Sequence, residues 1–296
     1  MIIGMEKVTI SRKSYLIFST VILLGFSFIC LYPVVYVVLA SFSDANQLMA
    51  YHGFLWKPLG ANLEAYKAIA QNPMIFSGYV NTLIVVGASL VVNIIMTGIA
   101  AYFLSRKGVM LKKAMMIYIM LTMYFSGGII PLYLTVRKLG MYNSLLSLIL
   151  PTAINTYNLI IMKTSFEAVP DSLIEAALLD GAGHVSTLFR VVLPLTSATV
   201  AVMVLYYGVG HWNSWFNAMI FLSDREKFPL QLVLREILIQ NDTSAMSQGV
   251  GMSDALNISK TIKYAVIVAA TVPILCVYPF LQKYFAKGAL VGAVKG

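Results

Sequence analysis

The feature that most constrains this chain is a series of long apolar runs that contain no aspartate or glutamate. The first, residues 15–42, is 28 residues long, and a helix needs about 20 apolar residues to cross a bilayer. Five more runs follow, at residues 79–104, 114–136, 145–163, 196–222 and 262–285. The hydrocarbon core contains no water to hydrogen-bond backbone N–H and C=O groups, and a helix satisfies these groups within one segment, so runs of this length are predicted to be helices. The sequence predicts an all-α polytopic membrane protein with six transmembrane helices.

Composition supports a chain that lies mostly in a bilayer. Hydrophobic residues make up 59% and charged residues 11% of the sequence, against about 45–50% and about 25% in a soluble domain. The net charge is +9, but the Lys and Arg residues are scattered between the apolar runs, which argues against a nucleic-acid-binding stripe. Cys30 and Cys276 both lie inside apolar runs, which predicts neither a disulfide nor a metal framework.

The distribution of Lys and Arg predicts which loops face the cytoplasm. Four basic residues crowd the loop 104–113, and basic loops stay on the cytoplasmic side. With six spans, both termini and the loop after the fourth span then lie on that side. A basic start before an apolar run also describes a signal peptide. However, the first run far exceeds the roughly 7–15 residues of a signal sequence's apolar region, which predicts a retained span.

The predicted organisation is one domain, preceded by a span that can pack separately. The expected parts are a cytoplasmic tail, a first span, an external loop, a core of five spans and a second cytoplasmic tail. Their residues are 1–14, 15–42, 43–75, 76–285 and 286–296, respectively.

The loop after the fourth span predicts a helix, a sharp turn and a second helix. Pro170 suits the start of a helix, and Asp171 and Glu175 place negative charge near its positive end. Gly181 stands where a left-handed residue normally ends a helix, and residues 185–192 can form the second one. An ordinary connector would carry the same local signals, so these signals alone do not separate a connector from a docking element.

The same loop, taken as residues 170–195, resembles the EAA loop of ABC-importer permeases. The resemblance is carried by Glu175-Ala176-Ala177, Gly181 and Leu193-Pro194, with Val191 where isoleucine is commoner. Residues 212–216 and the tail from Tyr278 to Gly296 are similar to the maltose-permease-G and lipopolysaccharide/oligosaccharide permease branch. The resemblance covers residues 75–296 and implies a type I ABC-importer permease fold with cytoplasmic coupling helices.

This resemblance implies a coupling surface and a set of partners. The surface would consist of Glu175, Ala176, Ala177, Asp180, Gly181 and Pro194. The partners would be a second permease subunit, two ATPase subunits that hold ATP and Mg²⁺, an extracytoplasmic solute-binding protein and a sugar substrate. The chain itself is expected to be embedded in lipid in a bacterial cell membrane, with no nucleic-acid partner, cofactor, metal or catalytic site of its own.

Polar and aromatic residues within the spans are the candidates for the substrate path. Asn amides pair with hydroxyls, and indole or phenol rings offer a flat apolar face to a sugar. Tyr207, His211 and Trp215 repeat every four residues, which predicts one helical face on which the indoles of Trp212 and Trp215 converge. Helix–helix hydrogen bonding and interfacial anchoring are the competing explanations, and packing is favoured for Asn81 and Asn93. The candidates are Asn155, Asn158, Tyr207, His211, Trp212, Asn213, Trp215 and Asn217.

Residues 223–260 are predicted to form a long, polar, flexible external loop. In the permeases that the chain resembles, the corresponding loop touches the binding protein. The resemblance therefore implies contacts through Asn241, Asp242, Ser244 and Gln248. A purely solvated loop is the alternative.

Two other classes of membrane protein fit this sequence less well. A secondary, ion-coupled sugar carrier would use a membrane carboxylate or an inverted repeat, and neither is found in the predicted spans. A membrane enzyme would need a convergent polar constellation, yet there is no H-E-x-x-H motif. A phosphate-binding G-x-x-x-x-G-K-[ST] motif is also missing. The sequence thus favours the permease subunit of an ATP-driven, binding-protein-dependent importer that moves an oligosaccharide by alternating access.

Overall fold

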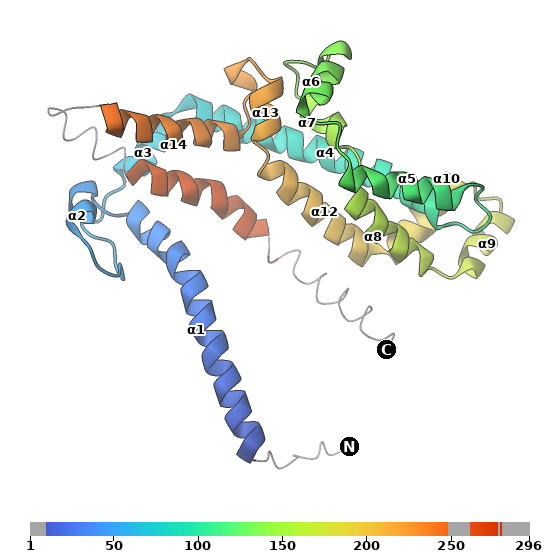
Figure 1. Ribbon diagram of the computed structural model, residues 1–296, viewed down its shortest axis with the longest axis horizontal. Helices are drawn as coiled ribbons and strands as arrows, with labels where there is room; N and C mark the ends of the chain where they lie inside the picture. Colours follow the sequence, from blue (N-terminus) through green and yellow to red (C-terminus); the bar gives the residue numbers. More distant parts are fainter. Residues whose placement is uncertain (1–9, 248–260, 278, 280–296) are drawn as a thin grey trace. The chain divides into compact units, whose positions relative to one another are not determined.

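A computed structural model describes residues 10–247, 261–277 and 279. The chain divides into two compact units. The first takes residues 1–71 and 240–269, and the second takes residues 72–239 and 270–296. Every regular element among the described residues is a helix (Figure 1), as the sequence predicts.

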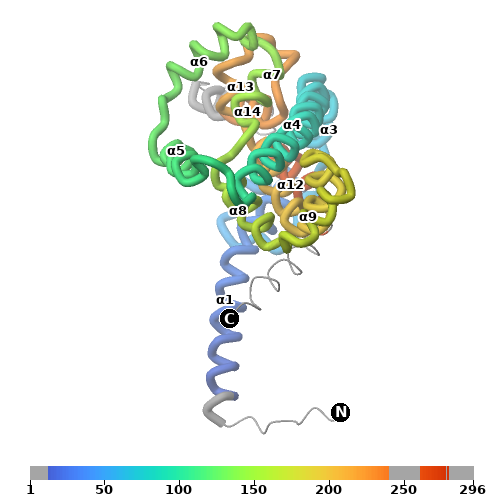
Figure 2. Tube along the Cα trace, turned by 90° about the vertical axis from the view of Figure 1, so that its right-hand side faces the viewer, coloured from blue at the N-terminus to red at the C-terminus, as the bar shows by residue number. Residues whose placement is uncertain are grey.

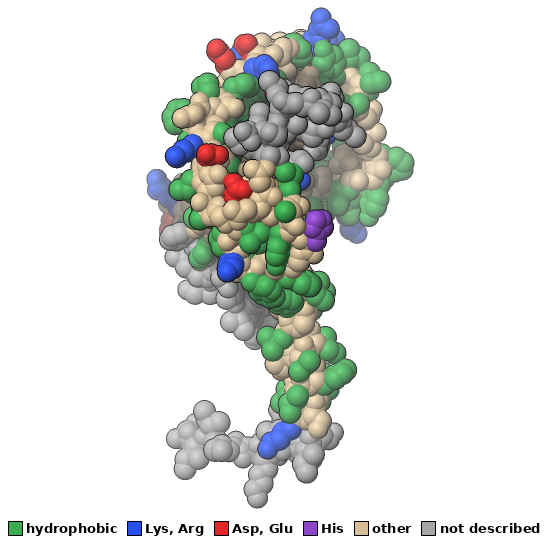
Figure 3. Space-filling view, turned by 90° about the vertical axis from the view of Figure 1, so that its left-hand side faces the viewer, with side chains coloured by type: hydrophobic (Ala, Val, Ile, Leu, Met, Phe, Trp, Pro, Cys, Tyr) green, Lys and Arg blue, Asp and Glu red, His purple; other side chains and the backbone are tan. Residues whose placement is uncertain are grey.

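The first unit contains a long, exposed apolar helix. Helix α1 (Ile10–Ser41) carries hydrophobic side chains along its length (Figure 3). Tyr15, Phe18 and Leu24 are 69%, 66% and 64% exposed. Because a helix that is apolar all round avoids water, α1 fits the predicted first span.

The segment after α1 is partly folded. It holds two short helices, α2 (Ala45–Ala50) and α3 (Glu64–Gln71). Asp44 caps α2 by accepting two backbone N–H groups of its first turn, as an N-cap carboxylate does. The rings of Tyr32 and Trp56 meet with their centroids 6.0 Å apart, and such aromatic contacts suit a membrane interface.

The second unit packs three helices around one core. Helices α4 (Pro73–Ser105), α8 (Thr156–Glu167) and α12 (Ser197–Trp212) contact one another (Figure 1). Small residues let helices approach closely in a membrane, and Ser89, Thr97 and Ala101 of α4 are fully buried. Phe166 and Met203 fill the space between the helices and are themselves fully buried.

The predicted third span is sharply bent. It consists of α5 (Lys112–Tyr124) and α6 (Ile129–Lys138), whose axes differ by 111°; Figure 2 shows the turn between them. Gly128 has φ +85°, a conformation that glycine accepts without strain. The bend therefore falls at the Gly127-Gly128 pair.

The fourth and fifth predicted spans are also interrupted. Short helices α7 (Leu146–Ile149) and η1 (Leu150–Thr152) precede α8. Pro151 is the second residue of η1, and a proline cannot donate a backbone hydrogen bond to the preceding turn. After α12, the chain leaves the helical path before α13 (Phe216–Phe221).

Helix length and composition bound the number of spans. Two described helices are long and apolar enough to cross a membrane, or up to four if each bent pair counts as one span. The helix Thr261–Val277 is apolar but shorter. The count of six therefore stays a prediction.

The prediction of a flexible loop over residues 223–260 is wrong for most of the segment up to residue 247. Helix η3 (Arg225–Lys227) is followed by α14 (Leu230–Ser247). The backbone N–H of Leu230 donates to the Thr82 hydroxyl at 2.8 Å, and a Cβ added to Gly78 would lie 3.1 Å from the Leu230 Cα. The start of α14 is thus fixed closely against α4 by a hydrogen bond and a close backbone approach, which its mixed sequence does not reveal.

Candidate functional site

The EAA-like loop, residues 170–195, begins with helix α9 (Asp171–Leu179), for which Pro170 is the N-cap residue. The helix ends in a turn where the N–H groups of Gly181 and Ala182 donate back to its last turn, both at 3.0 Å. Gly181 has φ +81°, the left-handed conformation that such a helix end requires. The predicted helix, glycine stop and turn are confirmed.

The second arm of the loop is a chain of short helical pieces. These are α10 (His184–Thr187), the π-helix η2 (Leu188–Val192) and α11 (Leu193–Leu195). A 90° bend at Thr196 then separates this arm from α12. Pro194 lacks the N–H that would continue a regular helix, so an irregular π segment and a bend around it are expected.

One face of α9 is anchored and the other is free. Ile174 is 5% exposed and belongs to the core cluster of the second unit. Glu175 and Ala176 are exposed, and Leu179 is 88% exposed. The helix therefore presents a small, partly apolar surface to any molecule that meets the loop.

The start of α9 is tied electrostatically to the end of α4. The Lys107 Nζ lies 2.7 Å from an Asp171 carboxylate oxygen, and an Arg106 nitrogen lies 3.8 Å from the other oxygen. The hydrogen bond from Lys107 and the positive charges hold the pKa of the Asp171 carboxyl below its ordinary value. The pKa of Lys107 is raised, first by the same hydrogen bond, so both groups are charged at neutral pH.

Further ties brace the segment before α9. The carboxylate of Glu167 accepts from Lys112 at 3.0 Å and from Lys163 at 2.8 Å. Burial would raise the pKa of Glu167, but these two hydrogen bonds outweigh it and lower that pKa. The Arg106 guanidinium donates to the carbonyl of Phe166 at 2.9 Å.

The second arm of the loop also touches α4. The Tyr102 hydroxyl lies 3.2 Å from His184 Nδ1, and the Arg106 guanidinium carbon lies 5.1 Å from the centre of the Tyr102 ring. Both arms of the EAA-like loop are therefore linked to the same end of α4. The sequence interpretation treated Arg106 and Lys107 only as topology signals. The available clue was that this basic loop and the acidic pair Glu167 and Asp171 were assigned to one side of the membrane.

Tyr207 and His211, two candidates for the substrate path, make hydrogen bonds that connect the helices of the core. The Tyr207 hydroxyl lies 2.7 Å from the Thr97 hydroxyl and accepts the backbone N–H of Asn155 at 3.0 Å. His211 Nε2 lies 3.1 Å from Asn93 Oδ1, and the Asn93 amide donates to two carbonyls before α8, at 2.6 and 3.0 Å. The packing role expected for Asn93 is confirmed, and a role for Tyr207 and His211 in the path stays a prediction.

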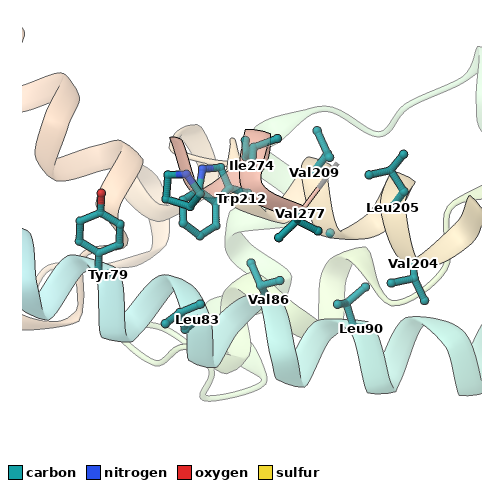
Figure 4. Close-up of a pocket in the computed structure, with 12 residues that line it drawn as sticks. Tyr79, Leu83, Val86, Leu90, Val204, Leu205, Val209, Trp212, Ile274 and Val277 are labelled. Atoms are coloured by element: carbon teal, nitrogen blue, oxygen red, sulfur yellow. The ribbon is translucent and has the colours of Figure 1, made fainter. Parts of the chain in front are cut away.

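Trp212 lines an apolar groove between helices of the second unit. Its indole N–H donates to the Ala270 carbonyl at 3.1 Å. The groove has a volume of about 480 Å³. Aliphatic side chains of α4, of α12 and of the helix that contains Ile274 surround it, with Tyr79 at one end (Figure 4). A sugar needs several converging polar groups, so this groove suits lipid tails or another helix and not a saccharide.

The prediction that Tyr207, His211 and Trp215 share one helical face is wrong. Helix α12 ends at Trp212, and Trp215 lies beyond the break, where the spacing of four no longer applies. The indoles of Trp212 and Trp215 do not converge in the described structure. Trp212 contacts the ring of Tyr79, and Trp215 contacts that of Phe216. Asn213 and Ser214 favour helix ends and turns, but the sequence interpretation followed the spacing of the aromatic residues instead.

The four Asn candidates have different surroundings. Asn158 is buried, whereas Asn155 is exposed and caps α8 by accepting the Asn158 N–H at 3.1 Å. Asn213 is exposed and donates to a carbonyl of its own helix at 3.0 Å. Asn217 is half-buried in α13. Exposure thus leaves Asn155, Asn213 and Asn217 with the freedom to meet a ligand.

The residues expected to meet a binding protein lie at the far end of α14. Asn241, Asp242 and Ser244 fall within that helix, so the flexible-loop interpretation of these three residues is wrong. Gln248 lies outside the described residues.

The arrangement defines a class of protein: a helical membrane protein with an exposed helix–turn–helix linked to its core. Comparison with known proteins identifies the class more closely. Residues 93–291 match the family described as binding-protein-dependent transport system inner membrane component. The chain belongs to this family, in which the EAA motif and the coupling helix are typical features.

Individual relatives agree over nearly the whole chain. It is 40% identical to the polygalacturonan/rhamnogalacturonan transport system permease protein YtcP of Bacillus subtilis, covering 93% of this chain and 96% of the relative. It is 39% identical to Protein LplC of the same organism, over 92% of each chain. One solved structure, of a bacterial ABC transporter involved in the import of the acidic polysaccharide alginate, matches with TM-score 0.84 and 29% identity. That match covers 94% of this chain and 98% of the other.

These findings establish the general role. The chain is a membrane-embedded permease component of an ABC importer and is not an enzyme. A permease of this kind works with a partner permease, an ATPase and a binding protein. Family membership displaces the secondary carrier as an explanation.

Proposed function

We propose that this chain is one of two different membrane-spanning subunits of an importer for an oligosaccharide. Two ATPase subunits, which bind ATP and Mg²⁺, would drive it from the cytoplasm, and an extracytoplasmic binding protein would deliver the sugar. The named relatives support this choice of substrate class, since one is a polygalacturonan/rhamnogalacturonan permease and another structure belongs to an alginate importer.

The single observation that carries the mechanism is the linked, exposed coupling helix. Glu175, Ala176 and Leu179 form the free face of α9, and Asp171 joins the same helix to Lys107 at the end of α4. When ATP closes the ATPase dimer, α9 moves with the ATPase surface and pulls α4 through these contacts. The ATPase can shift the equilibrium between the inward-open and outward-open states only if it binds the two states with different affinities.

The proposed orientation follows the distribution of charge. The loop 104–113, the EAA-like loop and both termini face the cytoplasm of a bacterial cell, and the segments 43–75 and 223–260 face outward. This places the break between α12 and α13 toward the outer side. We therefore assign Asn213, Trp215 and Asn217 to the outer part of the substrate path, and the far end of α14 to the surface that meets the binding protein.

A reconstitution experiment tests the function. The chain, tagged at a terminus, is purified from its native bacterium and its companions are identified by mass spectrometry. We expect a second permease, an ATPase and a binding protein. Proteoliposomes that contain this complex should accumulate oligosaccharides only with both ATP and binding protein. Uptake driven by a proton or sodium gradient without ATP would contradict the proposal.

A further inference from the structure

A stacked arginine and tryptophan lie beside the break between α12 and α13. The guanidinium carbon of Arg235, on the first turns of α14, lies 3.4 Å from the centre of the Trp215 ring. Both side chains are half-buried. At this distance the guanidinium plane covers one face of the indole, a contact favoured by the ring's negative π face. The two residues are 20 positions apart in the sequence, so the pair joins the break after α12 to helix α14.

The part of α14 that carries Arg235 is firmly packed. Leu232, Val233 and Leu234 directly before it are only 2–3% exposed. The segment that leads into α14 is fixed to α4, because the Asn81 amide donates to two of its carbonyls, at 2.6 and 3.2 Å. A guanidinium held in this way loses little rotamer freedom when it binds a ligand, which favours affinity.

The electrostatics of Arg235 differ from those of its neighbours. Residues 213–239 contain three cations, and two of them have carboxylate partners: Arg225 pairs with Glu236, and Lys227 with Asp224. Within the described part of the chain, the Arg235 guanidinium has the Trp215 ring as its contact and no carboxylate. A guanidinium stacked over a ring still directs its N–H groups outward within its own plane, where they match the two oxygens of a carboxylate.

We propose that Arg235, stacked on Trp215, binds a carboxylate group of an acidic saccharide at the outer part of the substrate path. The inference rests on the proposed sugar-import function and adds a charge class to the substrate: chains that contain uronic acid. Arg235 binds the carboxylate with two parallel hydrogen bonds. The face of the indole away from Arg235 is suited to the C–H face of the sugar ring.

Two sugars that differ only at the carboxylate test the inference. Initial uptake of α-1,4-linked trigalacturonate and of α-1,4-linked galactotriose is measured in proteoliposomes that hold the complete importer, with saturating ATP and binding protein. Arg235→Gln should lower uptake of trigalacturonate about ten- to hundred-fold, as expected for the loss of a charged hydrogen-bonded pair. It should leave the lower rate for galactotriose unchanged. Arg235→Lys keeps the charge but loses the planar fork, so it should recover only part of the trigalacturonate rate.

Arg225→Gln is the matched control, since Arg225 is an exposed cation of the same segment that pairs with Glu236. It should leave trigalacturonate uptake near the wild-type rate. Equal losses for both sugars in Arg235→Gln would make the pair a structural contact and overturn the inference. If the wild-type importer takes up galactotriose but not trigalacturonate, the inference is also overturned, while the proposed import function stands. Uptake of neither sugar by a complex that hydrolyses ATP would count against both.

Discussion

The turn at Gly181 provides a test of the coupling loop that isolates one physical effect. Gly181 donates its N–H to Leu178, and Ala182 donates to Ala177, both at 3.0 Å. Substitution of Gly181 by valine leaves these donors in place. A Cβ at this position would meet no atom within 4 Å, so no clash is introduced. The remaining cost is that of holding a β-branched residue at φ +81°.

The size of this cost can be bounded. A side chain held in a sparsely populated backbone region costs about 1–3 kcal/mol, which corresponds to about a 5- to 150-fold change in an equilibrium. The chain can escape the strain by opening the turn, which releases the end of α9. We therefore expect Gly181→Val to lower the population of the native turn, and sugar uptake with it, by a factor within that range.

Gly183 offers a matched control two residues away. It also has no atom within 4 Å of an added Cβ, but its φ of −71° and ψ of 162° form ordinary extended backbone. Valine accepts this conformation, although as an N-cap it is a poorer choice than glycine. Gly183→Val should therefore retain most of the wild-type activity. Gly181→Asn should lie between the two, because asparagine tolerates left-handed backbone better than valine does.

The assay is uptake together with binding-protein-stimulated ATP hydrolysis in proteoliposomes, with complex assembly checked by size-exclusion chromatography. We expect Gly181→Val to assemble in the membrane but to lose stimulated hydrolysis and uptake together. Wild-type hydrolysis and uptake in Gly181→Val would refute the role of the left-handed turn. Equal damage from Gly181→Val and Gly183→Val would show that bulk at the loop surface matters and that backbone conformation does not.

Four other predictions concern the Lys107–Asp171 ion pair, its pH dependence, the hydrogen bonds of Asn93 and the orientation of the chain in the membrane. Lys107→Asp and Asp171→Lys should each lower uptake about two- to five-fold, as for an exposed ion pair, and the charge-swapped double variant should recover it; no recovery would exclude a direct pair. The pKa of Asp171 is lowered from 3.8, so as the pH falls from neutral the pair's contribution should stay complete down to that pH and be lost only as the pH falls through the lowered value. A loss of wild-type uptake between pH 8 and pH 5 that disappears in Asp171→Asn would contradict this assignment. Asn93→Ala should destabilise the purified complex by about 1–3 kcal/mol, since it leaves buried polar partners unpaired, and thermal unfolding unchanged from wild type would contradict the network around this fully buried side chain. In a variant without native cysteines, an impermeant thiol reagent applied to intact cells should label Lys138→Cys but not Ser186→Cys, and the reverse pattern would invert the proposed orientation.

Several features of the fold could be predicted from the sequence because they are local. Long apolar runs require helices in a bilayer, and α1 and α4 match two of them closely. Gly181 and Gly128 mark a left-handed helix end and a span break, since glycine alone takes such φ values freely. The EAA-like pattern was also readable, because its helix, stop and second helix depend on neighbouring residues.

Contacts between distant segments were decided only by the tertiary structure. Spacing alone selected His211 as a path candidate, and only the fold shows that Asn93, 118 positions away, holds it in a buried network. The polar composition of residues 223–260 indicated a loop, yet burial of Leu230 against α4 stabilises α14. Packing energy of this kind depends on which surfaces meet, and local propensity carries no information about that.

The same distinction applies to charge. The sequence by itself determined an α-helical membrane protein, the position of its coupling loop and the sign of each ionisable group. Only the tertiary structure decided which charges meet, because Coulomb attraction falls with distance and the chain separates partners that the fold brings together. Lys107 with Asp171 is one such pair. Arg235 is another such case: its formal charge was readable in the sequence, but its position over Trp215 follows from the packing of α14 beside the break in the fifth span.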